Sequence, residues 1–377
     1  MSEENSPSLA RQVCAPLTSP HVVDTGSRGM PAGSSGADLF GYLVLVGKIE
    51  GFAERRTYAF DMGFGFCELC AEAFFLNGQN DGPDHPCPTR PRIIDPSKHM
   101  VTNYKGVQAF LNVTKIPAGY QIIVENGLPI DVNCQNRGFD TTVVFFQGAI
   151  DPSWTLPAFG GMGVSSDAQV NRIFISDPSL VLTDRLNLGW FVGNSRMNIQ
   201  KNLLQIINHI VDMWGQQRVV FYGASGGGFA SLFFSAHFPG SLAIVSNPQT
   251  NVAKYELPAV ERFAEVCYGV KGEDPMSRLP DDVTTNLVEL YREPRGNVVA
   301  YMQNSTDFSH VEDHMNPFLS ASHPDNEIHV LLGDWGNGHV APPKPIHVEA
   351  LTVAASPDWQ SGLAAMGFER AQLPPSE

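Results

Sequence analysis

The sequence lacks long apolar runs and lacks an excess of basic residues. No segment approaches the roughly 20 consecutive apolar residues of a membrane-spanning helix. The opening MSEENSPSLARQ has neither the basic n-region nor the apolar h-region of a secretory signal. Lysine and arginine total 24 against 39 aspartates and glutamates, a formal charge of -15. This charge repels nucleic-acid phosphates and anionic lipids. We therefore expect a cytoplasmic protein whose main activity involves neither nucleic acid nor a membrane.

Cysteine is also scarce, with six irregularly spaced residues in 377. Such spacing is not typical of a disulfide framework, so reduced thiols are expected. Cys67 and Cys70 form a C-x-x-C pair, and with His85 and Cys87 they supply four residues of zinc-binding type. However, His85 and Cys87 have H-x-C spacing, and the Cys67–Cys70 pair adjoins an apolar run. Both observations favour buried free thiols over a zinc site. Zinc binding at these four residues stays open.

Composition divides the chain into three predicted parts. Residues 1–36 are rich in Ser, Gly and Pro and lack periodicity, which predicts a flexible arm. Residues 37–138 contain short β-like runs such as GYLVLVG, TYAF and YQIIVENG between turn signals, which predicts a β-rich accessory module. Residues 139–377 have a different texture and are expected to form the catalytic domain.

Strongly apolar runs in residues 139–377 alternate with helical patterns. The runs are TVVFFQGA, RIFISDPS, QRVVFYGASGGG, LAIVSNPQ, NVVAYMQNSTD and IHVLLGDWGNGH. Strands that are apolar on both faces indicate a parallel sheet covered by helices. The crossover NIQKNLLQIINHIVDMWG has apolar residues at helical spacing, ending with Met213. The fold class is therefore predicted to be α/β, a mostly parallel sheet with helices on both faces.

A serine lies between one of these strands and a predicted helix. Gly223-Ala224-Ser225-Gly226-Gly227 fits G-x-S-x-G, in which small residues permit a sharp turn that exposes the serine hydroxyl. The alternative interpretation is a glycine-rich turn with an incidental serine. The strand before and the helix after supply the context that the motif needs, so we predict Ser225 as a nucleophile.

A serine nucleophile needs a base and an acid that orients the base. His339 lies in a glycine-rich loop after the last apolar strand, and Asp307 follows the strand before it. This order predicts His339 as the base and Asp307 as the acid. Asp313 and Asp334 are rival acids, and turn formation is the alternative role for all three.

Backbone N–H groups must stabilise the oxyanion that forms when serine attacks a carbonyl. One should come from Gly226, directly after the nucleophile, and the other from Gly148 or Ala149 in the loop after an early strand. Polar residues at the same edge of the sheet are expected to line the substrate pocket. These residues are Gln147, Asn247 and Gln249.

A second histidine cluster follows Asp307. His310, Asp313 and His314 have the i, i+3, i+4 spacing that would suit a metal on one helix face. The adjacent Asp307 is better assigned to the triad, and the spacing is explained better by a solvated helix start than by a metal site. We therefore predict no metal and no cofactor.

Residues 139–377 resemble the α/β-hydrolase superfamily in three features. These are the G-x-S-x-G turn at Ser225, called the elbow below, the acid Asp307 after a later strand, and the terminal loop that carries His339. SNPQTNVAKY, the QN-x-x-D-x-x-H run that ends at His310, and GxGH before a proline-rich helix start are similar to a bacterial subgroup found beside surface-polysaccharide glycosyltransferases. That subgroup is similar to the acetyltransferase component of the accessory Sec glycoprotein-export system. The resemblance implies an α/β-hydrolase-type fold and ester hydrolysis or acyl transfer on a glycan-like substrate.

The predicted function is a serine hydrolase that forms an acyl-serine intermediate. Its expected substrate is an acylated glycan or a small-molecule ester, and the enzyme would be an esterase or acyltransferase. A peptidase using the same triad and a non-catalytic binding protein on this fold are the alternatives. Hydrolysis, acyl transfer and peptide cleavage share the same nucleophile and base, so the sequence does not choose among them, and it specifies no oligomeric state.

Overall fold

The computed structural model describes residues 90–215 and 218–375. All of them belong to one compact unit, Thr89–Glu377. The predicted arm and the part of the predicted module before residue 90 lie outside the described residues.

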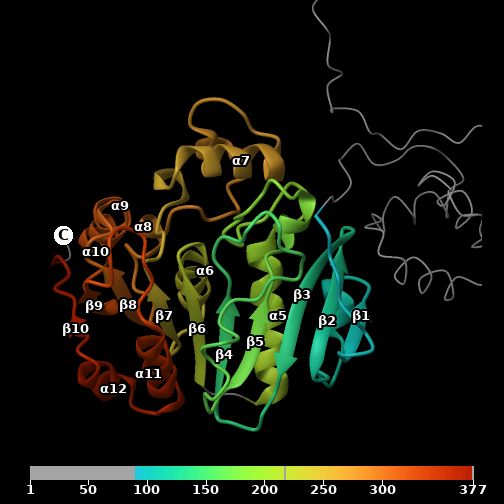
Figure 1. Cartoon of the computed structure of the whole chain (residues 1–377), viewed down its shortest axis with the longest axis horizontal. Coiled ribbons are helices and arrows are strands. Elements are labelled where there is room, and N and C mark those ends of the chain that lie inside the picture. The colour runs from blue at the N-terminus through green and yellow to red at the C-terminus, as the bar shows by residue number, and fades with distance from the viewer. Residues whose placement is uncertain (1–89, 216–217, 376–377) are drawn as a thin grey trace, which may run out of the picture. The chain divides into compact units, whose positions relative to one another are not determined.

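The described residues form a ten-stranded sheet in the order β1-β2-β3-β5-β4-β6-β7-β8-β9-β10 (Figure 1). Strands β4 to β9 pair in parallel, whereas β3 is antiparallel to both neighbours and β10 is antiparallel to β9. The strands are β1 Val101–Tyr104, β2 Gly119–Glu125, β3 Leu128–Gln135, β4 Thr141–Phe146, β5 Asn171–Ile175, β6 Arg218–Ala224, β7 Leu242–Ser246, β8 Val298–Asn304, β9 Glu327–Gly333 and β10 Glu369–Arg370.

The sheet crosses the predicted domain boundary at residue 138. Strand β3 pairs with β5, with Val132 opposite Ile175, so β1 to β3 extend the sheet that carries β4 to β9. A tight turn with positive φ at Asn126 and Gly127 joins β2 to β3. Local hairpin signals suggested a separate module, because the partner of β3 is about 40 residues away in the chain and leaves no local signal.

The described helices cover both faces of this sheet. The predicted crossover helix is α5, in which Ile199, Leu203 and Ile210 are buried, although Met213 is 43% exposed. No helix in the described ranges is long and apolar enough to cross a membrane. The α-helices are α4 Val107–Leu111, α5 Ile199–Trp214, α6 Gly226–Ser235, α7 Leu257–Tyr268, α8 Leu287–Leu290, α9 Phe308–His310, α10 Asn316–Ala321, α11 Lys344–Ala355 and α12 Trp359–Ala365. The other helical segments are η1 Pro178–Leu182, η2 Val252–Lys254, η3 Pro275–Arg278 and η4 Val311–Met315.

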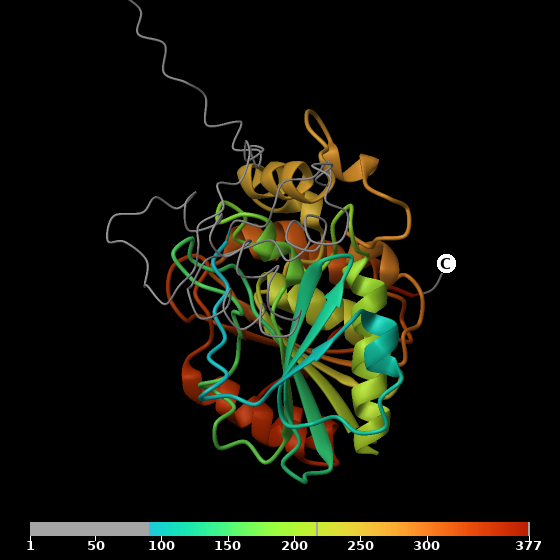
Figure 2. The same ribbon diagram turned by 90° about the vertical axis from the view of Figure 1, so that its right-hand side faces the viewer.

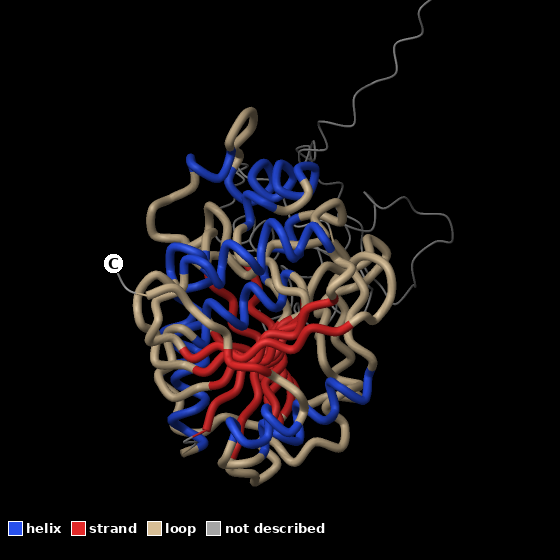
Figure 3. The backbone as a smooth tube through the Cα atoms, turned by 90° about the vertical axis from the view of Figure 1, so that its left-hand side faces the viewer, coloured by secondary structure: helices blue, strands red, loops and turns tan. Residues whose placement is uncertain are grey.

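Alternation along the strands sends side chains into two separate apolar layers. Val144 and Phe146 of β4 pack with α5, α6 and α7, whereas Val143 and Phe145 pack with α11 and α12. Figure 2 shows α5 and the red C-terminal helices on opposite sides of the strands, and Figure 3 shows the strands as a twisted fan between helices. The predicted α/β class is thus confirmed, with a mostly parallel sheet and helices on both faces.

Candidate active site

Ser225 lies in the sharp turn between β6 and α6. Its φ of 54° and ψ of -120° are rare for a residue with a side chain, so the surrounding structure must hold this strained backbone. A Cβ on Gly223 would collide with the carbonyl of Gly227, and a Cβ on Gly227 would lie 2.5 Å from the Phe146 carbonyl oxygen. The two glycines of the motif are therefore required by close backbone contacts.

Loops that follow parallel strands meet at one edge of the sheet, where ligands usually bind in open α/β folds. Gly148 follows β4, Ser225 follows β6 and Gln249 follows β7. Asp307 follows β8, and His339 follows β9. Five predicted site residues therefore share the carboxyl edge of the sheet.

His339 and Asp307 form a short hydrogen bond, with 2.7 Å between Nδ1 and Oδ2. The His339 side chain is 41% exposed and that of Asp307 only 3%. Burial opposes ionisation of Asp307, but the hydrogen bond from His339 and the nearby imidazoles of His310 and His339 hold its pKa below the usual value. An ionised Asp307 fixes the proton of His339 on Nδ1 and leaves Nε2 as the basic nitrogen.

The rival acids lie elsewhere. Asp334 is exposed, and its Oδ1 accepts a hydrogen bond from the Gly336 N–H at 3.2 Å, as expected of a turn former. Asp313 is also exposed. Across residues 90–215 and 218–375, the hydrogen bonds of His339 to a carboxylate are made with Asp307 alone.

Two buried asparagines hold the loop that carries His339. Asn304 Nδ2 donates to the carbonyl of Gly338 at 2.6 Å, and Asn247 Nδ2 donates to the carbonyl of Val340 at 2.9 Å. Asn247 Oδ1 also accepts from the Asn304 N–H at 2.7 Å. Asn247, predicted to line the pocket, therefore bonds to main chain around the base. Asn304 was not predicted, although it lies in the QN-x-x-D-x-x-H run.

The Ser225 hydroxyl has a different neighbour from the one predicted. Gln249 Nε2 donates to Ser225 Oγ at 2.8 Å, and Gln249 Oε1 accepts from Trp190 Nε1 at 2.7 Å. Within the described part of the chain, no hydrogen bond joins His339 to Ser225. The structure therefore joins the base to its acid, and the nucleophile to Gln249.

The predicted oxyanion residues border the elbow. Gly226 is the first residue of α6, and N–H groups in the first turn of a helix lack partners within the helix. A Cβ on Gly148 would lie 3.1 Å from the Ala224 carbonyl oxygen and 3.7 Å from Ser225 Cβ. Ala149, next in this loop, is exposed. The backbone of this loop thus lies directly against the elbow.

The side chain of Gln147 has a structural role in the fold. This side chain is buried, with the amide nitrogen facing Ile175. This nitrogen donates to the Ile175 carbonyl oxygen at 2.8 Å, and the amide oxygen accepts from the Asp177 N–H at 2.9 Å. Both polar atoms of the amide therefore bond to main chain. This arrangement ties the loop after β4 to the end of β5, and it does not present the amide to a substrate.

A second imidazole shares Asp307. His310 Nδ1 lies 3.1 Å from Oδ1 and 3.0 Å from Oδ2 of Asp307, and its ring stacks on that of His339 with centroids 4.1 Å apart. Burial and repulsion from His339 lower the pKa of His310, despite the attraction of Asp307. His310 is therefore a neutral imidazole at pH 7. In the sequence, His310 belongs to the cluster weighed as a metal site and ends the QN-x-x-D-x-x-H run, but neither pattern predicted its bond to Asp307.

Asp307, His310 and His339 bring possible metal-ligand atoms within 4.8 Å of one another. Both Nδ1 atoms already lie at hydrogen-bonding distance from the Asp307 carboxylate, which accounts for the closeness of the three groups. In the cluster weighed from the sequence, His314 is buried beside His310 and Asp313 is exposed. The arrangement favours a hydrogen-bonded network over a metal centre.

The thiols of Cys134 and Cys267 are free and buried, and burial raises the pKa of each. They are accordingly unreactive near pH 7. Four possible zinc ligands weighed from the sequence lie outside the described residues: Cys67, Cys70, His85 and Cys87.

Trp190 connects the nucleophile to the helix-containing segment between β7 and β8. Its ring contacts Phe263 of α7, with centroids 5.3 Å apart, and Tyr255, with centroids 5.8 Å apart. In Figure 1, α7 stands beyond one end of the strands. Trp190 is fully buried, so its indole N–H reaches Gln249 through a dry interior.

A buried carboxylate holds the turn that carries Trp190. Trp190 and Phe191 have φ of 52° and 57°, two successive side-chain residues in left-handed conformation. Asp177 accepts hydrogen bonds from the N–H groups of Phe191 and Ser179, each at 2.9 Å. Burial raises the pKa of Asp177 to about 6, although the two N–H groups oppose the shift.

The raised pKa of Asp177 predicts a pH-dependent stability. A carboxyl whose pKa is higher in the folded state stabilises the fold below its unfolded pKa, and that contribution is lost as pH rises through about 6. Relative to Asp177→Asn, which does not titrate, the wild type should lose about 2 kcal/mol of unfolding free energy between about pH 4 and about pH 7. Urea unfolding of both proteins at the two pH values measures this. A constant difference would contradict the prediction.

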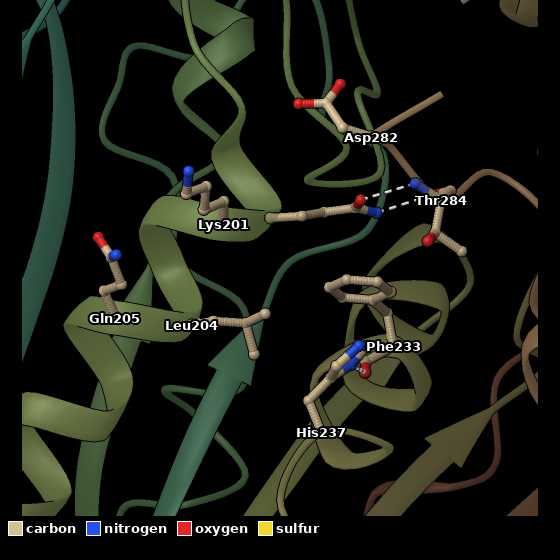
Figure 4. A pocket seen from close by; sticks show the side chains of 8 residues that line it. Lys201, Leu204, Gln205, Phe233, His237, Asp282 and Thr284 are labelled. Carbon is tan, nitrogen blue, oxygen red and sulfur yellow. Dashed lines mark hydrogen bonds between the residues drawn. The ribbon is translucent and has the colours of Figure 1, made fainter. Parts of the chain in front are cut away.

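A hollow of about 390 Å³ lies between α5, α6 and the segment 282–284 (Figure 4). Gln200 and Thr284 bridge it with two hydrogen bonds of 2.8 Å, which tie the segment to α5. No member of the predicted triad lines this hollow. The lining residues are Gln200, Lys201, Leu204, Gln205, Phe233, His237, Asp282 and Thr284.

No protein-family model and no curated protein matches the sequence. Among solved structures, a capsule O-acetyltransferase of Neisseria meningitidis serogroup A aligns over 57% of this chain and 88% of its own, with 15% identity and a TM-score of 0.42. An S-formylglutathione hydrolase from Agrobacterium tumefaciens aligns over 62% and 91%, with 10% identity and a TM-score of 0.40. An acylaminoacyl peptidase of Pyrococcus horikoshii aligns over 66% and 40%, with 11% identity and a TM-score of 0.42. Each of these three alignments has a TM-score below 0.5, so none assigns a function to this chain.

Proposed function

We propose that this protein is a serine hydrolase or acyltransferase that works through an acyl-serine intermediate. One observation carries the proposal: a strained serine turn opens at the same sheet edge as a histidine bonded to a buried, ionised aspartate. Each part has a role in activating a hydroxyl that is otherwise a weak nucleophile. The roles assigned are nucleophile for Ser225, base for His339 and orienting acid for Asp307.

In the proposed acylation step, Nε2 of His339 takes the hydroxyl proton of Ser225 while Oγ bonds to the acyl carbon. The N–H groups of Gly226 and Gly148 or Ala149 stabilise the resulting oxyanion. His339 then gives the proton to the departing oxygen, which leaves an acyl-serine. The contact between His339 and Ser225 must close when substrate binds, as catalytic hydrogen bonds often do.

Deacylation by water makes the enzyme an esterase, and deacylation by a hydroxyl of an acceptor makes it an acyltransferase. The proposed substrate is an acylated glycan or a small-molecule ester, on the basis of the motif resemblance around SNPQTNVAKY and Gln303–His310. A peptidase would use the same three residues. The substrate classes therefore have to be separated by assay with acyl esters, acetylated glycans and peptides.

A fluorophosphonate probe tests the proposal, because it reacts with activated serines and not with ordinary ones. Folded protein should acquire one covalent adduct, and mass spectrometry should locate it on Ser225. Heat-unfolded protein is the control and should stay unlabelled. A folded protein that does not label would favour the alternative, a non-catalytic binding protein.

A further inference from the structure

The side-chain amide of Gln249 is held in one orientation. Indole nitrogen is only a donor, so the Gln249 atom 2.7 Å from Trp190 Nε1 must be the oxygen Oε1. The amide nitrogen Nε2 then faces Ser225 Oγ at 2.8 Å and His310 Nε2 at 3.5 Å. Gln249 is fully buried, so water does not compete for these groups.

Trp190 fixes the Gln249 amide from one side, and His310 can hold it from the other because of the position of the His310 proton. Its Nδ1 donates to Asp307, and a neutral imidazole then has a lone pair on Nε2. That lone pair faces the second N–H of the Gln249 amide. The amide is thus held between Trp190 and His310, and it presents one N–H to Ser225.

Building on the proposed function, we propose that Gln249 is a catalytic residue, a clamped hydrogen-bond donor that directs the Ser225 proton toward His339 and stabilises negative charge on Oγ. Trp190 and His310 are its positioning residues. This role differs from the substrate binding expected of Gln249 from the sequence.

The chemistry follows from the donors and lone pairs of a hydroxyl. The Gln249 N–H occupies one lone pair of Ser225 Oγ, so the hydroxyl proton must point away from the amide. As that proton passes to Nε2 of His339 and the bond from Oγ to the acyl carbon forms, Gln249 keeps its own protons throughout. Hydrogen bonds to charged oxygens are stronger than those to neutral ones, so the N–H helps most while Oγ carries charge.

The same donor serves the second half of the reaction. In the acyl-serine, Oγ is an ester oxygen and a weaker acceptor. When water or an acceptor hydroxyl attacks, the bond between Oγ and the acyl carbon breaks, and Oγ takes back a proton from His339. Gln249 again faces the oxygen on which charge develops, so its loss should slow both halves.

The test compares rates of fluorophosphonate labelling. Gln249→Met keeps the side-chain length but removes the N–H, and should lower the rate about 10- to 100-fold, as for one hydrogen bond to a charged group. Trp190→Phe retains a ring against Phe263 while freeing the amide to turn, and should also lower the rate. Because both changes act through one donor, the double variant should be little slower than the slower single variant.

Matched controls are the same substitutions at exposed residues outside the site, Gln205→Met and Trp154→Phe. Both should label at the wild-type rate. Circular dichroism confirms that each variant is folded before its rate is measured.

Wild-type labelling rates in folded Gln249→Met or in folded Trp190→Phe would overturn the inference and leave the proposed function intact. Failure of the wild type to label would instead overturn the proposed function. If Gln249→Met does not fold, Gln249→Glu decides the matter. An ionised glutamate repels charge on Oγ, so its labelling should fall as pH rises while wild-type labelling does not. A pH profile like that of the wild type would overturn the inference.

Discussion

Ser225→Ala should abolish hydrolysis of a short acyl ester, with a loss in kcat on the order of 10⁶, as when a triad nucleophile is removed. The hydroxyl of Ser225 is the proposed attacking atom, and no other hydroxyl occupies the turn between β6 and α6. A chromogenic ester assay measures the loss, and a folded variant with wild-type turnover would remove Ser225 from the mechanism.

The control for this substitution is Ser361→Ala. Ser361 is an exposed serine on α12. Its replacement should leave turnover unchanged, because α12 packs on the opposite apolar layer from α6. The comparison separates loss of the nucleophile from a general effect of changing serine to alanine.

His339→Ala should cause a loss of similar order, because nucleophile and base act as a unit. His310→Ala should lose far less activity, since His310 reaches Ser225 only through Gln249. The His339 side chain is 41% exposed, so added imidazole can enter the space it leaves. Ester assays with and without imidazole should show partial rescue of His339→Ala.

The opposite pattern would reassign the base. If His310→Ala were inactive and His339→Ala retained most of its turnover, then the buried imidazole would be the base on Asp307. The two histidines thus form a matched pair, since each donates to the same carboxylate.

Much of the fold was predictable because its signals are local. The apolar run of residues 143–146 within β4 indicates burial on both faces, and helix Ile199–Trp214 has apolar residues at helical spacing. The turn at Ser225 was predictable because close packing demands glycine at Gly223 and Gly227. Asp307 could be ranked above Asp313 and Asp334 from strand order alone, and the structure bonds it to His339.

Contacts between distant loops were beyond local reasoning. Trp190 and Gln249 are 59 residues apart, and nothing in either segment indicates that an indole fixes an amide. The structural use of Asn247 and Gln147 was missed for a related reason: a polar residue after a strand looks the same whether it faces a substrate or a neighbouring loop. The pairing of β3 with β5 depends likewise on a remote partner.

The base is attached near one border of the sheet. His339 follows β9, which pairs on one side with β8 and on the other with only the two residues of β10, whereas β6, which precedes Ser225, has long partners on both sides. Border strands open at a lower free energy than central ones. Opening of β9 alone would separate His339 from Asp307 while the central strands and both apolar layers remained folded. Catalytic turnover would therefore report on the integrity of one edge, and inactivation would precede global unfolding.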